Sequence, residues 1–249
     1  MIIKNPEPRD VPALKALWRE AFGDGDDVIS AFFTVAYACD RCFTVEDEGR
    51  PIAAAYYFRC TAYGRPIAYI YAVAVAKSCR GRGICRLLME GIQRRLFLDG
   101  YAGAVLVPAD EKLFAMYEKL GYTAQIPISE TYVTEEALRA CLAEKVSAEE
   151  YARLRREHLP EGGVVQELES LAYLSANAEL YRMHHGVACI FTENGRAVAA
   201  EVLGDSIERE CTTGDGCVKV RSAGNSKCFA LYKSFDGSDS PTYFGLAFD

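Results

Sequence analysis

The sequence of 249 residues lacks several features that would place it in common protein classes. It has no apolar run near the roughly 20 residues that a membrane-spanning helix needs. The first ten residues, MIIKNPEPRD, contain no apolar segment of the kind found in a secretory signal. We therefore expect a cytoplasmic protein that does not associate with a membrane.

Cysteines and histidines at the spacing of metal ligands are also scarce. Ten cysteines are scattered along the chain, and Cys39 and Cys42 form a single CxxC pair. A structural zinc site needs a second such pair or paired histidines at ligand spacing. The three histidines, His158, His184 and His185, lie far from that pair in the sequence. We expect no metal site, and we expect free buried thiols rather than disulfides.

Positive charge is limited and unevenly distributed. Residues 1–125 carry 16 Lys and Arg against 15 Asp and Glu, a net charge of +1. Residues 126–249 carry 12 against 20, a net charge of −8. No basic stripe of the kind that binds nucleic acid is present, so we expect no nucleic-acid partner. The acidic second half either aids solubility or favours a cationic substrate, and both interpretations stay open here.

The remaining composition is that of a globular protein, with half of the residues hydrophobic and a quarter charged. Residues 1–125 predict an α/β (α+β) domain: a mixed, mostly antiparallel sheet flanked by helices. Two β-α-β crossovers would make the later half of this sheet parallel. Strands are expected at 1–6, 42–46, 52–62, 67–75, 104–107 and from 122, and helices at 14–22, 28–36, 83–97 and 111–120.

Residues 126–249 predict a smaller α+β domain. Its helices are expected at 134–142, 147–157 and 168–182, and its strands at 187–192, 196–203, 217–221, 228–233 and 242–248. The turn Glu193-Asn194-Gly195 predicts a hairpin. This half contains no catalytic motif, so it is interpreted either as a degenerate copy of the first domain or as a substrate-side domain.

A turn rich in arginine and glycine, RGRGICR from Arg80 to Arg86, connects the strand that ends near Val75 to the next helix. A helix N-terminus presents unpaired N–H groups and the positive end of the helix dipole. Glycines let the backbone approach a ligand, and arginines add charge-assisted contacts to phosphate. The turn therefore predicts a pyrophosphate site. The dinucleotide fingerprint would need a third glycine where Arg86 stands, and the P-loop pattern is absent.

With its surroundings, this turn resembles the central motif of GNAT-type N-acetyltransferases, V-x-x-x-x-[QR]-x-x-G-x-[GA]. Val75, Arg80 and Gly83 stand at the required spacing, and Cys85 stands where the family usually has Gly or Ala. The family's next helix ends in Y-x-x-x-G-[FY], which matches the segment that begins at Tyr117 and ends in Gly-Tyr. The resemblance covers residues 1–125.

The resemblance implies acetyl-CoA as the cosubstrate and assigns roles to individual residues. Tyr117 would be the general acid that protonates the leaving thiolate. The strand Val73, Ala74 and Val75 would pair with the pantetheine arm of CoA like an added strand. Backbone N–H groups would hold the pyrophosphate, at Arg80, Gly81, Arg82, Gly83, Ile84, Cys85 and Arg86. Two departures lie at expected pantetheine contacts, because Asp110 and Leu113 stand where similar proteins often have Asn and Ala.

These motifs do not identify the base that accepts the amine proton. Candidates are Glu46, the strand tyrosines Tyr69 and Tyr71, and a group from the second half. The apolar ending YFGLAFD predicts a C-terminal segment that is held in place. The second half is weakly similar to Eis-like aminoglycoside acetyltransferases, and that resemblance implies the terminal carboxylate of Asp249 as the base.

We thus expect an N-acetyltransferase in which a primary amine attacks acetyl-CoA directly within a ternary complex. The alternatives are a non-catalytic acyl-CoA sensor and a transferase that uses aminoacyl-tRNA, although the latter needs a basic surface that this chain lacks. Polyamines, aminoglycosides, peptide N-termini and lysine all stay open as acceptors. A homodimer is the expected assembly, because two-fold dimers are the commonest oligomers.

Overall fold

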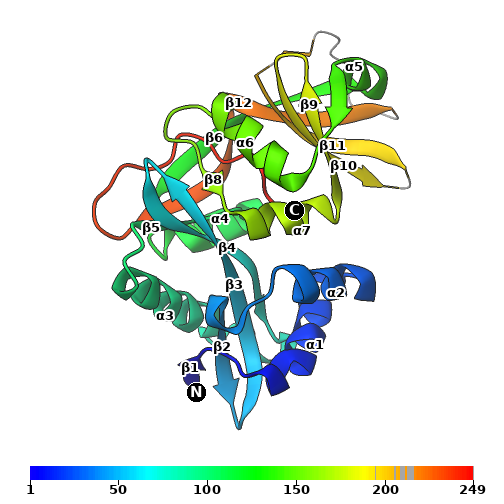
Figure 1. The fold of residues 1–249 in the computed structure, drawn as a ribbon. Helices are drawn as coiled ribbons and strands as arrows, with labels where there is room; N and C mark the ends of the chain where they lie inside the picture. The colour runs from blue at the N-terminus through cyan, green and yellow to red at the C-terminus, as the bar shows by residue number, and fades with distance from the viewer. Residues whose placement is uncertain (194, 205, 208–210, 212–215, 249) are drawn as a thin grey trace. The chain divides into compact units, whose positions relative to one another are not determined.

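A computed structural model of the protein shows two compact units (Figure 1). The structure describes residues 1–193, 195–204, 206–207, 211 and 216–248. The first unit comprises residues 1–124 and 231–239, and the second comprises residues 125–230 and 240–249. A short segment late in the sequence, residues 231–239, therefore belongs to the first unit.

The first unit is an open sheet with helices on both faces. Its strands are β1 (Ile2–Lys4), β2 (Cys42–Asp47), β3 (Arg50–Ala62), β4 (Arg65–Val75) and β5 (Gly103–Leu106). Its helices are α1 (Val11–Phe22), α2 (Asp26–Val35), α3 (Ile84–Leu98) and α4 (Glu111–Glu118). The strands neighbour one another in the order β1 to β5, and the end of β12 (Cys217–Ser234) follows beside β5. The expected mixed, mostly antiparallel sheet is confirmed.

Among the described residues of this unit, β4 and β5 form the one parallel pair. The prediction of a second parallel crossover after β5 is wrong. The following strand, β6 (Ala124–Thr134), pairs with β12 in the second unit instead of with β5. The edge of β5 is occupied by the end of β12, which runs antiparallel with Leu231 opposite Leu106. A strand more than 100 residues away in the sequence thus takes the position that local connectivity predicts for β6.

Opposite faces of the first sheet are covered by different helices (Figure 1). On α1, apolar residues three and four positions apart form one buried stripe. The Trp18 ring on this stripe lies 5.5 Å from Tyr56 of β3 and 5.6 Å from Tyr71 of β4, centroid to centroid. On the other face, α3 buries an apolar stripe of its own, made by Ile84, Leu88, Met89, Ile92 and Leu96. Helices on both faces therefore pack against the sheet that contains β3 and β4.

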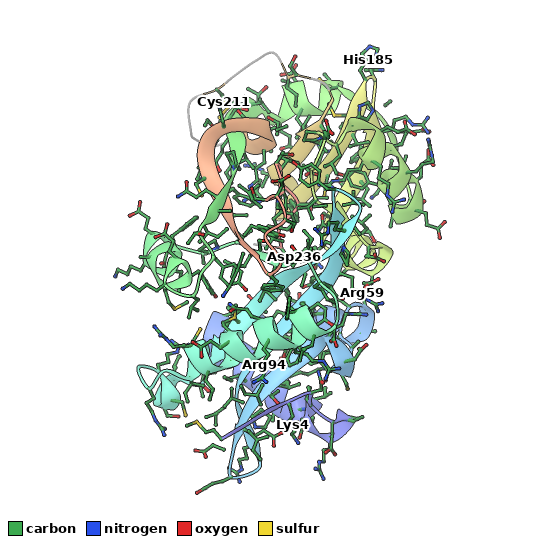
Figure 2. The ribbon with its side chains drawn as sticks, turned by 90° about the vertical axis from the view of Figure 1, so that its left-hand side faces the viewer. Lys4, Arg59, Arg94, His185, Cys211 and Asp236 are labelled. Carbon is green, nitrogen blue, oxygen red and sulfur yellow. A yellow bond between two sulfur atoms is a disulfide. The ribbon has the colours of Figure 1, made fainter. Side chains whose placement is uncertain are left out.

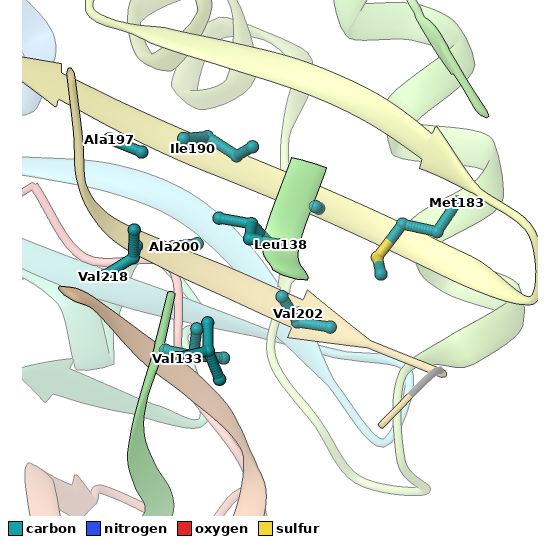
Figure 3. Close-up of a cluster of buried hydrophobic side chains, with 10 residues drawn as sticks. Val133, Leu138, Met183, Ile190, Ala197, Ala200, Val202 and Val218 are labelled. Carbon is teal, nitrogen blue, oxygen red and sulfur yellow. The ribbon is translucent and has the colours of Figure 1, made fainter. Parts of the chain in front are cut away.

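In the second unit, strands neighbour one another in the order β12, β11, β10, β9, β7. Its elements are β6, α5 (Glu135–Ala140), β7 (Leu142–Lys145), α6 (Ala148–His158), β8 (Val165–Gln166), α7 (Leu168–Ser175), β9 (Ala178–Met183), β10 (Gly186–Glu193), β11 (Arg196–Leu203) and β12. The predicted hairpin of β10 and β11 is present, with Val187 opposite Leu203. One buried cluster lies on this sheet (Figure 3), and its members are Val133, Leu138, Met183, Ala188, Ile190, Ala197, Ala200, Val202, Val218 and Val220.

Several elements of the second unit differ from the sequence-based expectation. The expected helix at 168–182 ends at Ser175, because the following residues form β9 and pair with β10 along a full ladder. Pairing with a neighbouring strand here overrides helix propensity. The expected strands at 217–221 and 228–233 are one continuous strand, β12. The expected strand at 242–248 is irregular chain in the described residues, with a single bridge between Tyr243 and Gly163.

The expectation of free thiols is also wrong at one place. Cys211, labelled in Figure 2, forms a disulfide with Cys217. Their Cα atoms lie 6.3 Å apart, which is within the range that a disulfide spans. The other eight cysteines form no disulfide within the described residues, and half of them are buried.

Candidate functional site

The central feature of the candidate site is the end of β4, where this strand separates from β5. The two strands pair over only three positions, from Ile67 opposite Gly103 to Tyr69 opposite Val105. Beyond Tyr69, β4 pairs with β3 alone among the described strands. The register with β3 also shifts there, and Ala72 adopts a φ of 50°, which is rare for a residue other than glycine. This is a β-bulge, and such bulges bend a strand and end its pairing on one side.

The turn after β4 presents a row of unpaired backbone donors. Helix α3 begins at Ile84, and its first internal hydrogen bond runs from the N–H of Leu87 to the carbonyl of Gly83 (3.0 Å). Among the described residues, none accepts a hydrogen bond from the N–H groups of residues 81–86. Six successive donors at a helix N-terminus form a site for an anion such as a phosphate.

The glycines of this turn keep its backbone open. Gly81 and Gly83 have φ values of 75° and 76°, in the left-handed region that strains other residues. A Cβ atom added at either position would meet no atom within 4 Å. Glycine is required here by the backbone conformation, and the space beside the turn is available to a ligand.

The arginine side chains of the turn differ in their contacts. Arg80 Nε donates to the carbonyl of Val75 (3.0 Å), so this side chain fixes the turn to the end of β4. Arg82 makes a weak contact with the sulfur of Cys79 (3.9 Å), and Arg86 is exposed. The backbone rather than the Arg80 side chain is therefore available for a phosphate. Cys85 is half-buried, and burial raises the pKa of its thiol, so it stays protonated at neutral pH.

Tyr117 lies on α4 and is only 7% exposed. Burial is the main cause of a pKa well above the ordinary tyrosine value, and the nearby Cys85 and Tyr122 add to the shift. The phenol therefore keeps its proton at neutral pH. Asp110 caps this helix by accepting a hydrogen bond from the N–H of Leu113 (2.9 Å). That cap gives Asp110 a structural role at the position where similar proteins often have Asn.

The candidate bases occupy different settings. Glu46 on β2 forms an ion pair with Lys4 on β1 at 3.0 Å, and Figure 2 labels Lys4. Tyr69 is 2% exposed, and Tyr71 is half-buried beside Trp18. Asp249 lies outside the described residues.

The chain that leads to Asp249 is firmly held within the second unit. The N–H of Val164 donates to the carbonyl of Tyr243 (2.8 Å), and Gln166 Nε2 donates to the carbonyl of Leu246 (3.1 Å). The ring of Phe248 lies 5.1 Å from that of Tyr173 on α7. The expectation of an anchored C-terminal segment agrees with these contacts, although the segment is not a strand.

One residue of the site was missed by the sequence analysis. Lys233 on β12 donates hydrogen bonds to Gln93 on α3 and to the backbone just after α4. The single hint in the sequence is a charged residue that directly follows the apolar run Phe229-Ala-Leu-Tyr232. Nothing in the sequence relates it to residues more than 100 positions earlier.

No group of described His, Cys, Asp or Glu residues is arranged to hold a metal ion. Within the same part of the chain, no helix combines the length and apolar character needed to cross a membrane.

Comparisons with known proteins relate part of the chain to a family. Residues 11–122 match the model of the acetyltransferase (GNAT) family. No curated protein matches the sequence. This family match supports acyl transfer in general.

Solved structures extend the likeness in fold to most of the chain. A GCN5-related N-acetyltransferase from Kribbella flavida is 17% identical with a TM-score of 0.63, over 94% of this chain and 72% of that chain. Eis1 from Mycobacterium abscessus is 12% identical with a TM-score of 0.64, over 95% and 74%. A GCN5-related N-acetyltransferase from Anabaena variabilis is 12% identical with a TM-score of 0.62, over 93% and 72%. The solved structures thus share the fold over most of the chain, and the family model identifies residues 11–122 as a domain of the GNAT acetyltransferase family.

Proposed function

We propose that this protein transfers an acetyl group from acetyl-CoA to a primary amine, which attacks directly in a ternary complex. The observation that carries the proposal is the juxtaposition of an unpaired strand end with a turn of unpaired donors. Beyond Tyr69, β4 no longer pairs with β5, and residues 81–86 have six unpaired N–H groups. A ligand with an extended amide arm and a pyrophosphate end matches both features.

The residues present fit CoA. Val73, Ala74 and Val75 would pair with the amide groups of the pantetheine arm, as a strand pairs with a sheet edge. The backbone N–H groups from Gly81 to Arg86 would hold the pyrophosphate, whereas the N–H of Arg80 already donates to the carbonyl of Lys77 (3.4 Å). The open space beside Gly81 and Gly83 supports this assignment, because a Cβ atom added at either glycine would meet no atom within 4 Å.

Acetyl-CoA supplies an activated acyl carbon when bound. The amine nitrogen forms a bond to this carbon as the carbon–sulfur bond breaks, and the amine gives up one proton. Backbone N–H groups at the end of β4 would polarise the thioester carbonyl, and positioning of the amine supplies much of the acceleration. Tyr117 would donate its proton to the leaving sulfur, since its buried phenol stays protonated at neutral pH.

The proton from the amine is assigned to the carboxylate of Asp249. This assignment is supported by the anchoring of the preceding segment at Tyr243 and Leu246. Glu46 suits the role less well, because Lys4 already pairs with its carboxylate. Two variants distinguish the two carboxylates of this residue. Asp249→Ala removes the side-chain carboxylate, and one glycine added after Asp249 moves the terminal carboxylate away. We expect one of these variants to lower kcat, and full kcat in both would exclude Asp249.

The acceptor is proposed to be a cationic small molecule, such as a polyamine or an aminoglycoside. The net charge of −8 on residues 126–249 favours a substrate of opposite charge. The competing acceptors are a peptide N-terminus and a lysine side chain.

Thiol release from acetyl-CoA in the presence of an amine panel tests the proposal. The panel contains a polyamine, an aminoglycoside, a peptide with a free N-terminus and a lysine derivative. Turnover with at least one amine is expected, and the cationic small molecules should give the highest kcat/KM. CoA binding without thiol release across the whole panel would instead favour an acyl-CoA sensor.

A further inference from the structure

Lys233, at the end of β12, joins the two helices of the candidate site. Its Nζ donates to Oε1 of Gln93 on α3 (2.6 Å) and to the carbonyl oxygen of Leu120 (2.8 Å). Gln93 is only 7% exposed, and Lys233 itself is half-buried, so these bonds are largely shielded from water. The lysine thus bridges the helix that opens with the phosphate turn and the helix that carries Tyr117.

The carbonyl that Lys233 binds belongs to the turn that ends α4. The N–H groups of Leu120 and Tyr122 both donate to the carbonyl of Tyr117, at 2.9 and 3.1 Å. A cation at a helix C-terminus is favourable because the carbonyl end of the helix dipole is negative. Lys233 therefore acts on the turn that is bonded directly to the backbone of Tyr117.

Gly121 makes room for this contact. A Cβ atom at this position would lie 2.9 Å from Nζ of Lys233 and 3.0 Å from its Cε, and the φ of Gly121 is 91°. The glycine four residues after Tyr117 in the sequence pattern thus allows the lysine to reach the end of α4.

We propose that Lys233 is a positioning residue for Tyr117: it fixes the end of α4 against α3 and so sets the Tyr117 hydroxyl relative to the turn at residues 80–86. This inference rests on the proposed role of Tyr117 as the general acid. Lys233 does not itself contact the reacting atoms, and its effect passes through the backbone of residues 117–122.

Hydrogen–deuterium exchange tests the positioning without a substrate. In Lys233→Met, which keeps the length of the side chain and removes its donors, amides 117–122 should exchange about tenfold faster than in the wild type. Lys233→Arg, which keeps the donors, should restore most of the protection. The matched control is Lys227→Met on the same strand, because Lys227 forms an exposed ion pair with Glu130 (2.9 Å). Unchanged exchange of 117–122 in Lys233→Met, or equal acceleration throughout the first unit, would overturn the proposal.

Kinetics with an amine identified by thiol release provide the second test. Lys233→Met should lower kcat about 10- to 100-fold with little change in the Kd of CoA, because displacement of a catalytic group chiefly affects the chemical step. In a Tyr117→Phe background, Lys233→Met should have no further effect on kcat. An equal loss in both backgrounds would overturn the inference. Full kcat in Tyr117→Phe alone would refute the general-acid role, whereas the exchange result would still report on the bridge.

Discussion

The guanidinium of Arg155 on α6 binds both carboxylate oxygens of Glu201 on β11, each at 2.9 Å. The same carboxylate accepts hydrogen bonds from the hydroxyls of Tyr151 (3.2 Å) and Tyr243 (3.0 Å). Both charged side chains are almost fully buried. Burial opposes the charge on Arg155, but the Glu201 carboxylate outweighs it and raises the pKa of Arg155. The network therefore ties α6 and the C-terminal segment to the sheet of the second unit.

Removing the carboxylate from this network should be strongly destabilising. Glu201→Gln leaves the buried charge of Arg155 without its partner, and we expect the free energy of unfolding to fall by about 3–5 kcal/mol. Urea unfolding followed by circular dichroism measures the change. Glu157→Gln is the control, because Glu157 on α6 pairs with Arg153 in solvent, and we expect little effect there. Equal losses in the two variants would contradict a special role for the buried network.

The hydroxyl of Tyr117 should matter for the chemical step and little for CoA binding. Tyr117→Phe removes one oxygen from a side chain that is otherwise packed, so the fold should persist. We expect kcat to fall by about 10²- to 10⁴-fold, the usual contribution of a general acid, with the Kd of CoA changed little. Tyr122→Phe is the matched control, since Tyr122 is its ring neighbour at 6.0 Å. Comparable losses of kcat in both variants would argue against a distinct role for Tyr117.

The pH dependence of kcat follows from the direction of the Tyr117 shift. Burial favours the neutral phenol, so the pKa of Tyr117 lies above its ordinary value of about 10. The acid therefore stays protonated as the pH rises, and we expect no Tyr117-dependent fall in kcat below about pH 10. A rate profile from neutral pH upward provides the measurement. In the wild type, kcat could instead fall below that pH, and the fall could disappear in Tyr117→Phe. That result would show that the pKa of Tyr117 is lowered, not raised.

CoA affinity should depend on the backbone of the turn. Gly83→Ala forces a residue with a Cβ into the left-handed region, at a cost of roughly 1–2 kcal/mol, and distorts the row of donors. Gly64→Ala in the β3–β4 turn is the control, because Gly64 also has a positive φ (71°) and open space around it. Calorimetric titration with CoA should show weaker binding only in Gly83→Ala. Equal Kd values for the two variants would place the pyrophosphate elsewhere.

Local signals in the sequence predict the first unit well. The period of apolar residues locates α1 and α3, and the glycine pattern of residues 81–83 identifies the turn before α3. These features depend on neighbours in the chain, so residue spacing is enough to find them. The bulge at Ala72 is different, because alanine carries no signal for a positive φ and the bulge arises from pairing with β3.

Long-range pairing accounts for most of what the sequence does not predict. The later part of the helix expected at 168–182 is the strand β9 instead, because these residues pair with β10. The end of β12 lies beside β5 and brings Lys233 to Leu120, across 113 residues. Nothing in the sequence marks Glu201 as a buried carboxylate, yet four hydrogen bonds from distant residues allow it to be buried.

The most direct test of the account is mass spectrometry of an amine after incubation with the protein and acetyl-CoA. We predict that a cationic small amine gains one acetyl group in proportion to the CoA thiol released, and that Tyr117→Phe forms this product far more slowly. An unmodified amine together with measurable CoA binding, across the whole amine panel, would contradict it.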